Sequence, residues 1–548
     1  MSLNNDRVPQ KQTALVLQGG GALGAYEAGA VQAIFDKLKE NENVPSFDII
    51  AGTSIEAITA SILVNHFMKN KKWDGLTSKL DEFWKDVSNI TYVELNPTFR
   101  MEWDYYHGIN PNAATVEAAR RYYSVKELLF YGSRNISGSP AIIPDAKFLD
   151  PLNTWYLYDS KPLEDLLIRK YLTEFPLKTS LGQPRLLLVS VDIEESTAVT
   201  FDSYEKNGGV RKTEYGDYEK DFSRNGQAKK GFEHIIAYND GLSIEHVLAS
   251  SAVPIFYEYK RIEGEPLPET ASGNGENKPD PRYFWDGILL SNTPLRELIN
   301  QHQDFWENKI GEPALLNDMW KIGDQPSIKK VPDLDVYIID IWPTKKDAVP
   351  SDHDESVDRM NDIMSNDKTD YDETVAMFVS DYIDFVKRMR NLAAEAISEL
   401  PSSNRKKKIL LENLDNTIPQ MRTKSTKRTG ERRLYQDLIK GRFNLNRVLR
   451  IERKEDHNTI SSKWQDFSSD TISQLLKSGY SEGSFQMDIY LQIDKVRDLA
   501  KRGKLTQDEA DDFVQQLIKI KRNYLTSGKE KDAEIELQEI IQNIQTIK

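Results

Sequence analysis

The stretch from Phe47 to Ala60 constrains this chain more than any other. It reads as a short apolar strand, an abrupt Gly52-Thr53-Ser54 corner and a helix of small and apolar residues. A serine at such a corner stands on a sharp strand-to-helix turn, where its hydroxyl is exposed at the sheet edge and the amides of the following helix point towards it. This geometry presents a weak nucleophile beside anion-stabilising donors. Ser54 is therefore the first candidate for a reactive residue.

A second strand-to-helix turn lies upstream. The apolar run from Thr13 to Gln18 ends on a glycine loop, Gly19-Gly20-Gly21-Ala22-Leu23-Gly24, and a helical pattern begins at Ala25. Bare backbone N–H groups and the positive end of a helix make such a turn an anion site. Two strand–turn–helix units in succession predict adjacent parallel strands with both turns at one edge. We therefore expect the glycine loop and Ser54 to face each other.

The glycine spacing leaves two alternatives open. Gly19-x-Gly21-x-x-Gly24 also matches the dinucleotide fingerprint, which requires an acidic residue at the end of the next strand, about twenty residues on. Here Asp48 lies inside or before that strand rather than after it. A site for an oxyanion is thus favoured over a nucleotide site, while glycines that serve only packing remain the second alternative.

Composition restricts the class of protein. At 548 residues the chain exceeds one ordinary core, which predicts two or three domains. A net charge of −14 argues against a general nucleic-acid binder, and 39% apolar with 29% charged residues is typical of a soluble protein. The absence of cysteine excludes disulfides and thiolate chemistry and agrees with a reducing compartment. With a polar N-terminus and no convincing membrane span, we expect a cytoplasmic protein.

The rest of the chain divides near Pro343. Before it we expect an aromatic-rich, mostly helical insertion or lid at 73–160 and a surface loop at 206–230. We also expect a helix at Ser243–Ser250 and further strands at Arg185–Val191, Ala198–Asp202, Tyr283–Trp285 and Leu334–Ile341. The aromatic rings could line an acyl-chain groove, but a satellite core is the favoured use.

Beyond Pro343, strand signals fade and helical patterns dominate. We expect helices over Asp372–Leu400, Arg405–Leu414 and Leu434–Leu449, then a pair of which the last starts at the capping box Thr506-x-x-Glu509. Basic residues cluster between Arg405 and Arg433 in this otherwise acidic chain. A solvated surface is the usual explanation for such a cluster, and contact with a phosphate-bearing membrane surface is the alternative.

A reactive serine also needs a base. Asp286-Gly287 ends the strand Tyr283–Trp285, which places a carboxylate at the sheet edge, although a capping aspartate is the alternative. A triad in α/β-hydrolase order would instead use His302, His353 or His457, which all lie in polar helical or loop sequence. A Ser54–Asp286 dyad needs fewer assumptions.

These motifs in this order resemble the patatin-like phospholipases. The resemblance rests on the glycine loop, Gly52-Thr53-Ser54 and Asp286-Gly287, with support from Glu245–Pro254 and Leu290–Leu295. It covers roughly Thr13 to Pro343, and the later helices resemble the C-terminal extension of a bacterial and archaeal branch. It implies an α/β fold with a mostly parallel sheet flanked by helices, a hydrolase domain at 10–345 with its insertion at 73–160, and a helical region at 346–548.

The resemblance also implies a function and its residues. The expected activity is that of a lipid acyl hydrolase, similar to a phospholipase A or lysophospholipase, with no cofactor and no catalytic metal. Ser54 would be the nucleophile and Asp286 the base. The oxyanion hole would be formed by amides of Gly19, Gly20, Gly21 and Gly24, and the motifs are completed by Gly52, Thr53, Glu56 and Gly287. A lipid or fatty-acyl ester is the expected partner, peripheral membrane contact is an open alternative, and no nucleic acid is expected.

Three positions depart from the family pattern. Leu23 replaces a usual basic residue, Ile288 follows Asp286-Gly287 in place of glycine or alanine, and Glu56 replaces the second glycine of Gly-x-Ser-x-Gly. In the first turn of its helix a carboxylate is favoured by roughly 0.3–1 kcal/mol, but near an oxyanion it would repel charge. We expect Glu56 to point away from the Ser54 hydroxyl, into the insertion or solvent. A catalytically weak or inactive scaffold is the alternative function.

Overall fold

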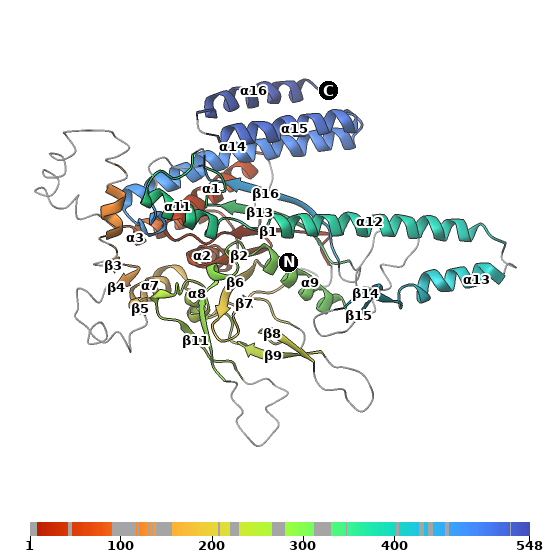
Figure 1. Cartoon of the computed structure of the whole chain (residues 1–548), viewed down its shortest axis with the longest axis horizontal. Helices are drawn as coiled ribbons and strands as arrows, with labels where there is room; N and C mark the ends of the chain where they lie inside the picture. Colours follow the sequence, from red (N-terminus) through yellow and green to blue (C-terminus); the bar gives the residue numbers. More distant parts are fainter. Residues whose placement is uncertain are drawn as a thin grey trace, which may run out of the picture.

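The computed structural model is built around one eight-stranded sheet (Figure 1). The structure describes residues 8–41, 46–89, 117, 120–126, 128, 132–133, 135–138, 156–206, 209–219, 230–265, 280–311, 330–346, 348–401, 405–426, 432–436, 442–454, 460–526 and 528–547. The strands lie in the order β11-β12-β6-β2-β1-β13-β16, with β7 also paired to β6.

The centre of the sheet is parallel and one edge is antiparallel. The parallel strands are β1 (Lys11–Leu17), β2 (Ile49–Thr53), β6 (Arg185–Asp192), β13 (Asp333–Asp340) and β16 (Leu445–Glu452). The antiparallel strands are β7 (Thr197–Asp202), β11 (Lys260–Ile262) and β12 (Arg282–Asp286). The expected parallel pairing of the first two strands is confirmed, because β1 and β2 are direct neighbours.

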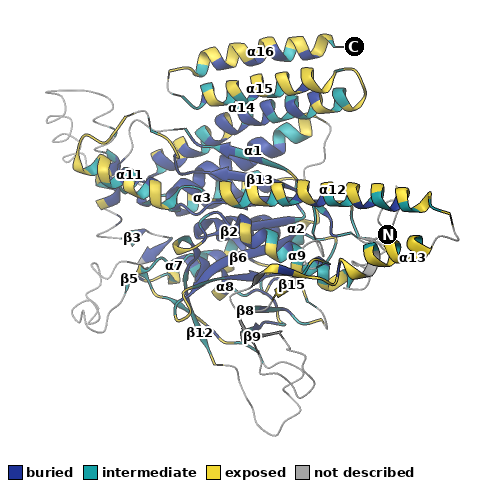
Figure 2. Ribbon diagram, turned by 45° about the vertical axis from the view of Figure 1, so that its right-hand side comes forward, coloured by how far each residue is buried: buried dark blue, intermediate teal, exposed yellow. Residues whose placement is uncertain are grey.

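Helices cover both faces of this sheet (Figures 1 and 2). Alternate side chains of a strand point to opposite faces, so Leu15 and Leu17 belong to one buried cluster and Ala14 and Val16 to another. The first cluster includes side chains of α1 (Gly24–Glu40), α2 (Ile55–Asn70), α3 (Leu76–Val87) and α8 (Ile244–Ser250). The second includes side chains of α9 (Leu295–Ile310) and α12 (Asp370–Ser398). The predicted α/β class is confirmed.

The first eleven residues of α2 lie inside the protein. Every residue from Ile55 to Asn65 is buried, as expected of a helix that is apolar on all sides. Its N-terminus follows Ser54 directly. The local sequence therefore fixes the corner at Ser54 between a buried strand and a buried helix.

Two predicted elements are wrong. The helix expected over Leu434–Leu449 is wrong at its end, where the chain forms β16 instead. Leu449 and Ile451 of this strand are buried at strand spacing, and β16 completes the parallel sheet beside β13. The loop expected at 206–230 contains the strand β8 (Lys212–Glu219), which pairs with β9 (Lys230–Ala237). In both cases pairing with a neighbouring strand outweighed a polar local sequence.

The predicted insertion at 73–160 lies largely outside the described residues. Its described parts include α3 and the short strands β3 (Gly132–Ser133), β4 (Ser137–Gly138) and β5 (Tyr156–Tyr158). Its role as a lid stays a prediction.

The chain after residue 345 is mostly helical, as expected. Its helices include α11 (His353–Ser365), α12, α13 (Arg405–Glu412), α14 (Ser469–Lys501), α15 (Gln507–Tyr524) and α16 (Glu530–Thr546), so three helices rather than a pair end the described chain. The capping box at Thr506 and Glu509 is confirmed. Among the helices that the structure describes, none combines the length and apolarity needed to cross a bilayer. Because β16 belongs to the main sheet, the domain boundary near residue 345 stays a proposal.

Glycines allow α14 to pack directly on α1. A Cβ atom at Gly479 would lie 1.9 Å from the Tyr26 carbonyl oxygen, and one at Gly29 would lie 2.1 Å from that of Leu476. Both positions have ordinary helical backbone, so it is space and not conformation that requires glycine. The helix after the glycine loop is thereby fixed to the C-terminal part of the chain.

We predict that Gly479→Ala destabilises the protein. In an open helix this change gains about 1 kcal/mol, whereas overpacking against backbone costs typically 1–3 kcal/mol. A lower free energy of unfolding in denaturant titrations would therefore show that the contact outweighs helix propensity. Ser481→Ala, at an exposed position of α14, is the control and should change stability by less than about 0.5 kcal/mol. A stabilised Gly479→Ala protein would contradict close packing of the two helices.

Candidate active site

Ser54 occupies a strained turn between β2 and α2. Its backbone has φ 67° and ψ −139°, a region that non-glycine residues rarely adopt and that costs about 1–3 kcal/mol. The turn needs Gly52, because a Cβ atom there would lie 2.5 Å from the Glu56 carbonyl oxygen. This is the geometry of a nucleophile elbow.

Asp286 meets Ser54 across the end of β6. Thr53 is in register with Val189, and Asp286 is in register with the next residue, Ser190. The Ser54 Oγ donates a hydrogen bond to Asp286 Oδ2 at 2.6 Å. The other carboxylate oxygen accepts from the Ile288 N–H at 2.9 Å, so both oxygens of Asp286 are held in place.

One segment positions both residues. At the end of α8, the Ser250 carbonyl accepts from the Ser54 N–H at 3.1 Å, and the Ala252 carbonyl accepts from the Asp286 N–H at 2.9 Å. Ser250 Oγ lies 3.2 Å from the same Ser54 N–H and itself donates to the Val189 carbonyl. The sequence predicted the helix at Ser243–Ser250 but not this contact.

Burial tunes the Asp286 carboxyl. The side chain is fully buried, which raises its pKa to about 7, while the hydrogen bonds from Ser54 and Ile288 act in the opposite direction. A base with a pKa near the working pH is suited to proton transfer.

The three histidine alternatives lie as follows. His302 is buried, with its Nε2 atom 2.8 Å from the Pro332 carbonyl oxygen. His353 begins α11, and His457 lies outside the described residues.

Most N–H groups expected in the oxyanion hole are already engaged. Gly19 N–H donates to the Asn292 carbonyl at 3.0 Å, Gly20 N–H donates to Glu56 Oε2 at 3.1 Å, and Gly24 N–H donates to the Gly21 carbonyl in the 3-10 turn that precedes α1. Gly21, at φ +60°, lines the cavity beside Ser54, and its N–H has no hydrogen-bond partner among the described residues. Of the four glycines, Gly21 is the one with a free donor.

The predicted orientation of Glu56 is wrong. The side chain points neither into the insertion nor into solvent but is fully buried, with Oε2 on the Gly20 N–H. The space it fills is provided by Gly24, where a Cβ atom would lie 2.1 Å from Glu56 Oε1. A glycine on α1 therefore compensates for the glycine missing from the elbow, a relationship between two motifs that neither shows alone.

Glu56 is favoured in its neutral form. Burial raises its pKa well above the usual value, and the nearby Asp286 charge raises it further. Glu27, on α1, is also fully buried, and its pKa is raised by burial and by Glu56. Glu56 Oε1 and Glu27 Oε2 have no hydrogen-bond partner in the described structure. A neutral carboxyl would not repel an oxyanion, so the electrostatic objection to Glu56 applies only when it ionises.

A cavity of about 240 Å³ opens over Ser54. Its lining is mainly apolar and includes Ile58, Leu248, Tyr257 and Ile288, while Lys260 is the one cationic side chain among the described lining residues. The far part of the chain contributes as well, through Asn361, Ser365, Trp464 and Phe467. Within the described residues, no group of three or more His, Asp or Glu side chains is placed to hold a metal ion.

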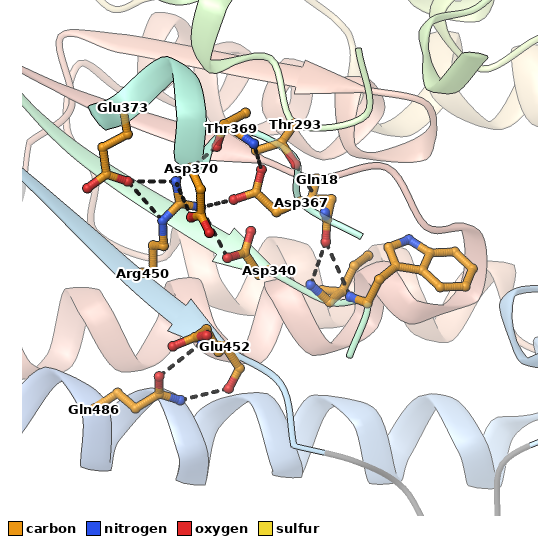
Figure 3. A network of polar contacts seen from close by, with 12 residues as sticks. Gln18, Thr293, Asp340, Asp367, Thr369, Asp370, Glu373, Arg450, Glu452 and Gln486 are labelled. Carbon is orange, nitrogen blue, oxygen red and sulfur yellow. Dashed lines mark hydrogen bonds and ion pairs between the residues drawn. The ribbon is translucent and has the colours of Figure 1, made fainter. Parts of the chain in front are cut away.

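Gln18 joins the glycine loop to the rest of this edge (Figure 3). Its Oε1 accepts from the Ile341 and Trp342 N–H groups at 2.7 and 3.2 Å, and its Nε2 donates to Thr293 Oγ1 at 3.0 Å. The Trp342 ring N–H donates to the Gly19 carbonyl at 2.7 Å. Gln18 was not among the predicted site residues, although its place directly before the glycines is a signal that could have identified it.

Comparisons with known proteins identify the family of this chain. A family profile described as patatin-like phospholipase matches residues 15–299, just over half of the chain. The crystal structure of VipD from Legionella pneumophila is similar at 12% identity and a TM-score of 0.21, covering 98% of this chain and 85% of that one. That of type III effector protein ExoU has 11% identity and a TM-score of 0.16, covering 98% and 91%. TM-scores this low carry no structural inference. No curated protein gave a significant match.

We predict that Asp286→Asn stabilises the protein at neutral and alkaline pH. The native pKa of about 7 lies above the ordinary aspartate value of about 3.9. The native state therefore holds a proton that the unfolded state has lost between these values, and stability falls as pH rises from about 4 to 7. The amide avoids this cost, which is at most about 4 kcal/mol.

Thermal unfolding between pH 4 and 8 tests this. The melting temperature of Asp286→Asn should exceed that of the wild type at pH 8, and the gap should close towards pH 4. Ser54→Ala is the control: it removes the hydrogen-bond donor but leaves the charge, so it should not stabilise at pH 8. A destabilised Asp286→Asn protein at pH 8 would contradict a costly buried carboxylate.

Proposed function

Because the chain belongs to the patatin-like phospholipase family, we propose that it is a lipid acyl hydrolase in which Ser54 and Asp286 form the catalytic dyad. The observation that carries the proposal is the 2.6 Å hydrogen bond between Ser54 Oγ and Asp286 Oδ2 beneath an apolar cavity. The family and the cavity together support a lipid ester as substrate.

The reaction would proceed in two acyl transfers. Ionised Asp286 accepts the Ser54 proton while Ser54 Oγ attacks the ester carbonyl. The alcohol then leaves with the proton from Asp286, and the acyl group stays on Ser54. A water molecule that loses its proton to Asp286 attacks this ester, and the Ser54 oxygen recovers a proton as the fatty acid leaves.

The oxyanion would rest on Gly21 rather than on the whole glycine loop. Its N–H is free among the described residues, while that of Gly20 is occupied by Glu56. Removing one such donor typically costs 10²–10³-fold in rate. Occupation of the Gly20 N–H is the observation that favours the alternative function, a weak or inactive scaffold.

The lining of the cavity bears on the substrate. Its apolar walls suit an acyl chain, and Lys260, which donates to Ser160 Oγ at 2.9 Å, offers a cation to an anionic head group. We propose that residues 10–345 form the hydrolase unit and that 346–548 is a mostly helical region that adds the outer wall of the cavity. We also propose that the protein is cytoplasmic and contacts membranes peripherally through the basic residues between Arg405 and Arg433.

We predict that a fluorophosphonate probe labels the wild type and not Ser54→Ala. Asp286→Asn should lower the labelling rate and the hydrolysis of phospholipid or lysophospholipid by about 10²–10⁴-fold, because the serine loses its base. Ser61→Ala is the matched control, since Ser61 lies on the same buried helix and outside the cavity. Labelling that survives Ser54→Ala would sink the assignment, and a wild type that neither labels nor hydrolyses lipids would favour the scaffold.

A second prediction concerns pH. The base works only when ionised, so kcat/KM should rise with pH through about 7, the pKa of Asp286. Burial and the Asp286 charge also raise the pKa of Glu56 well above its ordinary value, and once Glu56 ionises its carboxylate places a negative charge beside the Gly20 N–H, so the rate should fall. Glu56→Gln keeps the hydrogen-bond acceptor but cannot ionise, so it should retain the acid limb and lose the alkaline decline. An unchanged decline in Glu56→Gln would assign that limb to another group.

A further inference from the structure

The long helix α12 carries a row of apolar side chains that face solvent. The opposite side of the helix is buried on the protein, through Ser380, Ile383, Arg390 and Ala394. Figure 2 shows exposed residues recurring along α12, and in Figure 1 the helix extends past the sheet. The row, called the apolar stripe, consists of residues that are each at least 39% exposed: Tyr371, Val375, Phe378, Tyr382, Phe385, Met389 and Leu392.

The spacing of the stripe is that of a coiled coil. Its steps alternate between four and three residues, so each position recurs every seven residues, and Ala396 continues the series. A strict seven-residue repeat keeps one seam facing a partner helix, whereas an ordinary surface helix buries a 3.6-residue stripe against its own core. Here the core-facing stripe lies on the other side of α12, so the heptad seam is additional.

The base of α12 is anchored, so the stripe is displayed on a fixed support (Figure 3). Arg450 of β16 donates to Thr369 Oγ1 at 2.9 Å and to Glu373 Oε2 at 2.7 Å, and it lies 3.3 Å from Asp340 Oδ2 at the end of β13. The first turn of the helix is thereby tied to two strands of the sheet.

We infer that the apolar stripe binds the stripe of a second copy of this chain, with the two helices antiparallel. One register pairs every position of the stripe across the interface. In it Tyr382 meets Phe385 of the second copy, Phe378 meets Met389, and the outer pairs are Val375 with Leu392 and Tyr371 with Ala396.

The flanking residues support this register. On one side of the seam Asp381 falls opposite Arg388 of the second copy, and two-fold symmetry repeats the pair. Both side chains are exposed, and charges that flank the seam set the orientation of coiled coils. On the other side Val379 falls opposite Val386. In a parallel pair, Asp381 would instead face Val386 and no charge pair would form.

Charge disfavours a membrane as the occupant. Six carboxylates and three cations lie on α12, so the helix is net acidic. Helices that lie on membranes carry mostly Lys and Arg on the polar face, because the cytoplasmic leaflet is negative. An acidic helix with a heptad seam fits a second copy better than an anionic lipid surface.

Sedimentation equilibrium of the full chain tests the inference. The wild type should show twice the monomer mass of 62.9 kDa at concentrations of about 1–100 µM. Phe378→Glu combined with Phe385→Glu should give the monomer, since both residues are exposed in the single chain. The control Ile535→Glu changes an equally exposed apolar residue, on α16, and should leave the dimer intact.

Charge exchange tests the register. Asp381→Arg alone and Arg388→Asp alone should each weaken association at least about tenfold, and the double variant should restore it. Failure of the double variant to restore would overturn the antiparallel register. A wild type that stays monomeric at about 100 µM, or a dimer insensitive to the stripe variants, would overturn the inference. A monomer that binds neutral phosphatidylcholine vesicles only with an intact stripe would overturn it in favour of a lipid surface.

Discussion

The strained backbone at Ser54 is the constraint on which the site depends. A residue held in this conformation costs about 1–3 kcal/mol unless its surroundings determine it fully. Here Gly52 makes the turn sterically open, the Ser250 carbonyl holds the Ser54 N–H, and the Asp286 carboxylate accepts from the hydroxyl. Gly287 permits the approach from the other side, since a Cβ atom there would lie 2.4 Å from the Val189 carbonyl oxygen. The serine motif and the aspartate motif therefore depend on each other's close packing around the Ser54 turn.

Glu56 shows how this packing accommodates a glutamate in place of the elbow glycine. The elbow usually keeps a glycine at this position, and a carboxyl there must find volume and a hydrogen bond. Gly24 supplies the volume and the Gly20 N–H supplies the hydrogen bond. The consequence is chemical, because a donor of the glycine loop is engaged and a buried titratable group lies beside the base. Activity is therefore expected to depend on the protonation of two carboxyls rather than of Asp286 alone.

The sequence predicted the parts of the fold that local patterns encode. Parallel pairing of the first two strands followed from two strand–turn–helix units, and the meeting of Ser54 with Asp286 followed from both lying at strand ends. The strand Leu445–Glu452 was missed because its hydrophobic period is short and its assignment depends on the open edge of β13. Glu56 was placed wrongly because its surroundings are set by Gly24 on another helix, a contact that no local pattern contains.

Non-local contacts also tie the C-terminal half of the chain to the candidate active site. Lys463, only 4% exposed at its side chain, pairs with Asp358 at 3.0 Å and with Asp362. These ion pairs hold α11 beside the segment of Trp464, and both line the cavity over Ser54. Breaking a buried ion pair leaves an uncompensated charge at a cost of about 3–5 kcal/mol, so separation of α11 from the segment of Trp464 is strongly disfavoured. Since β16 also completes the sheet, the later half of the chain is a structural part of the candidate active site and not an appendage to it.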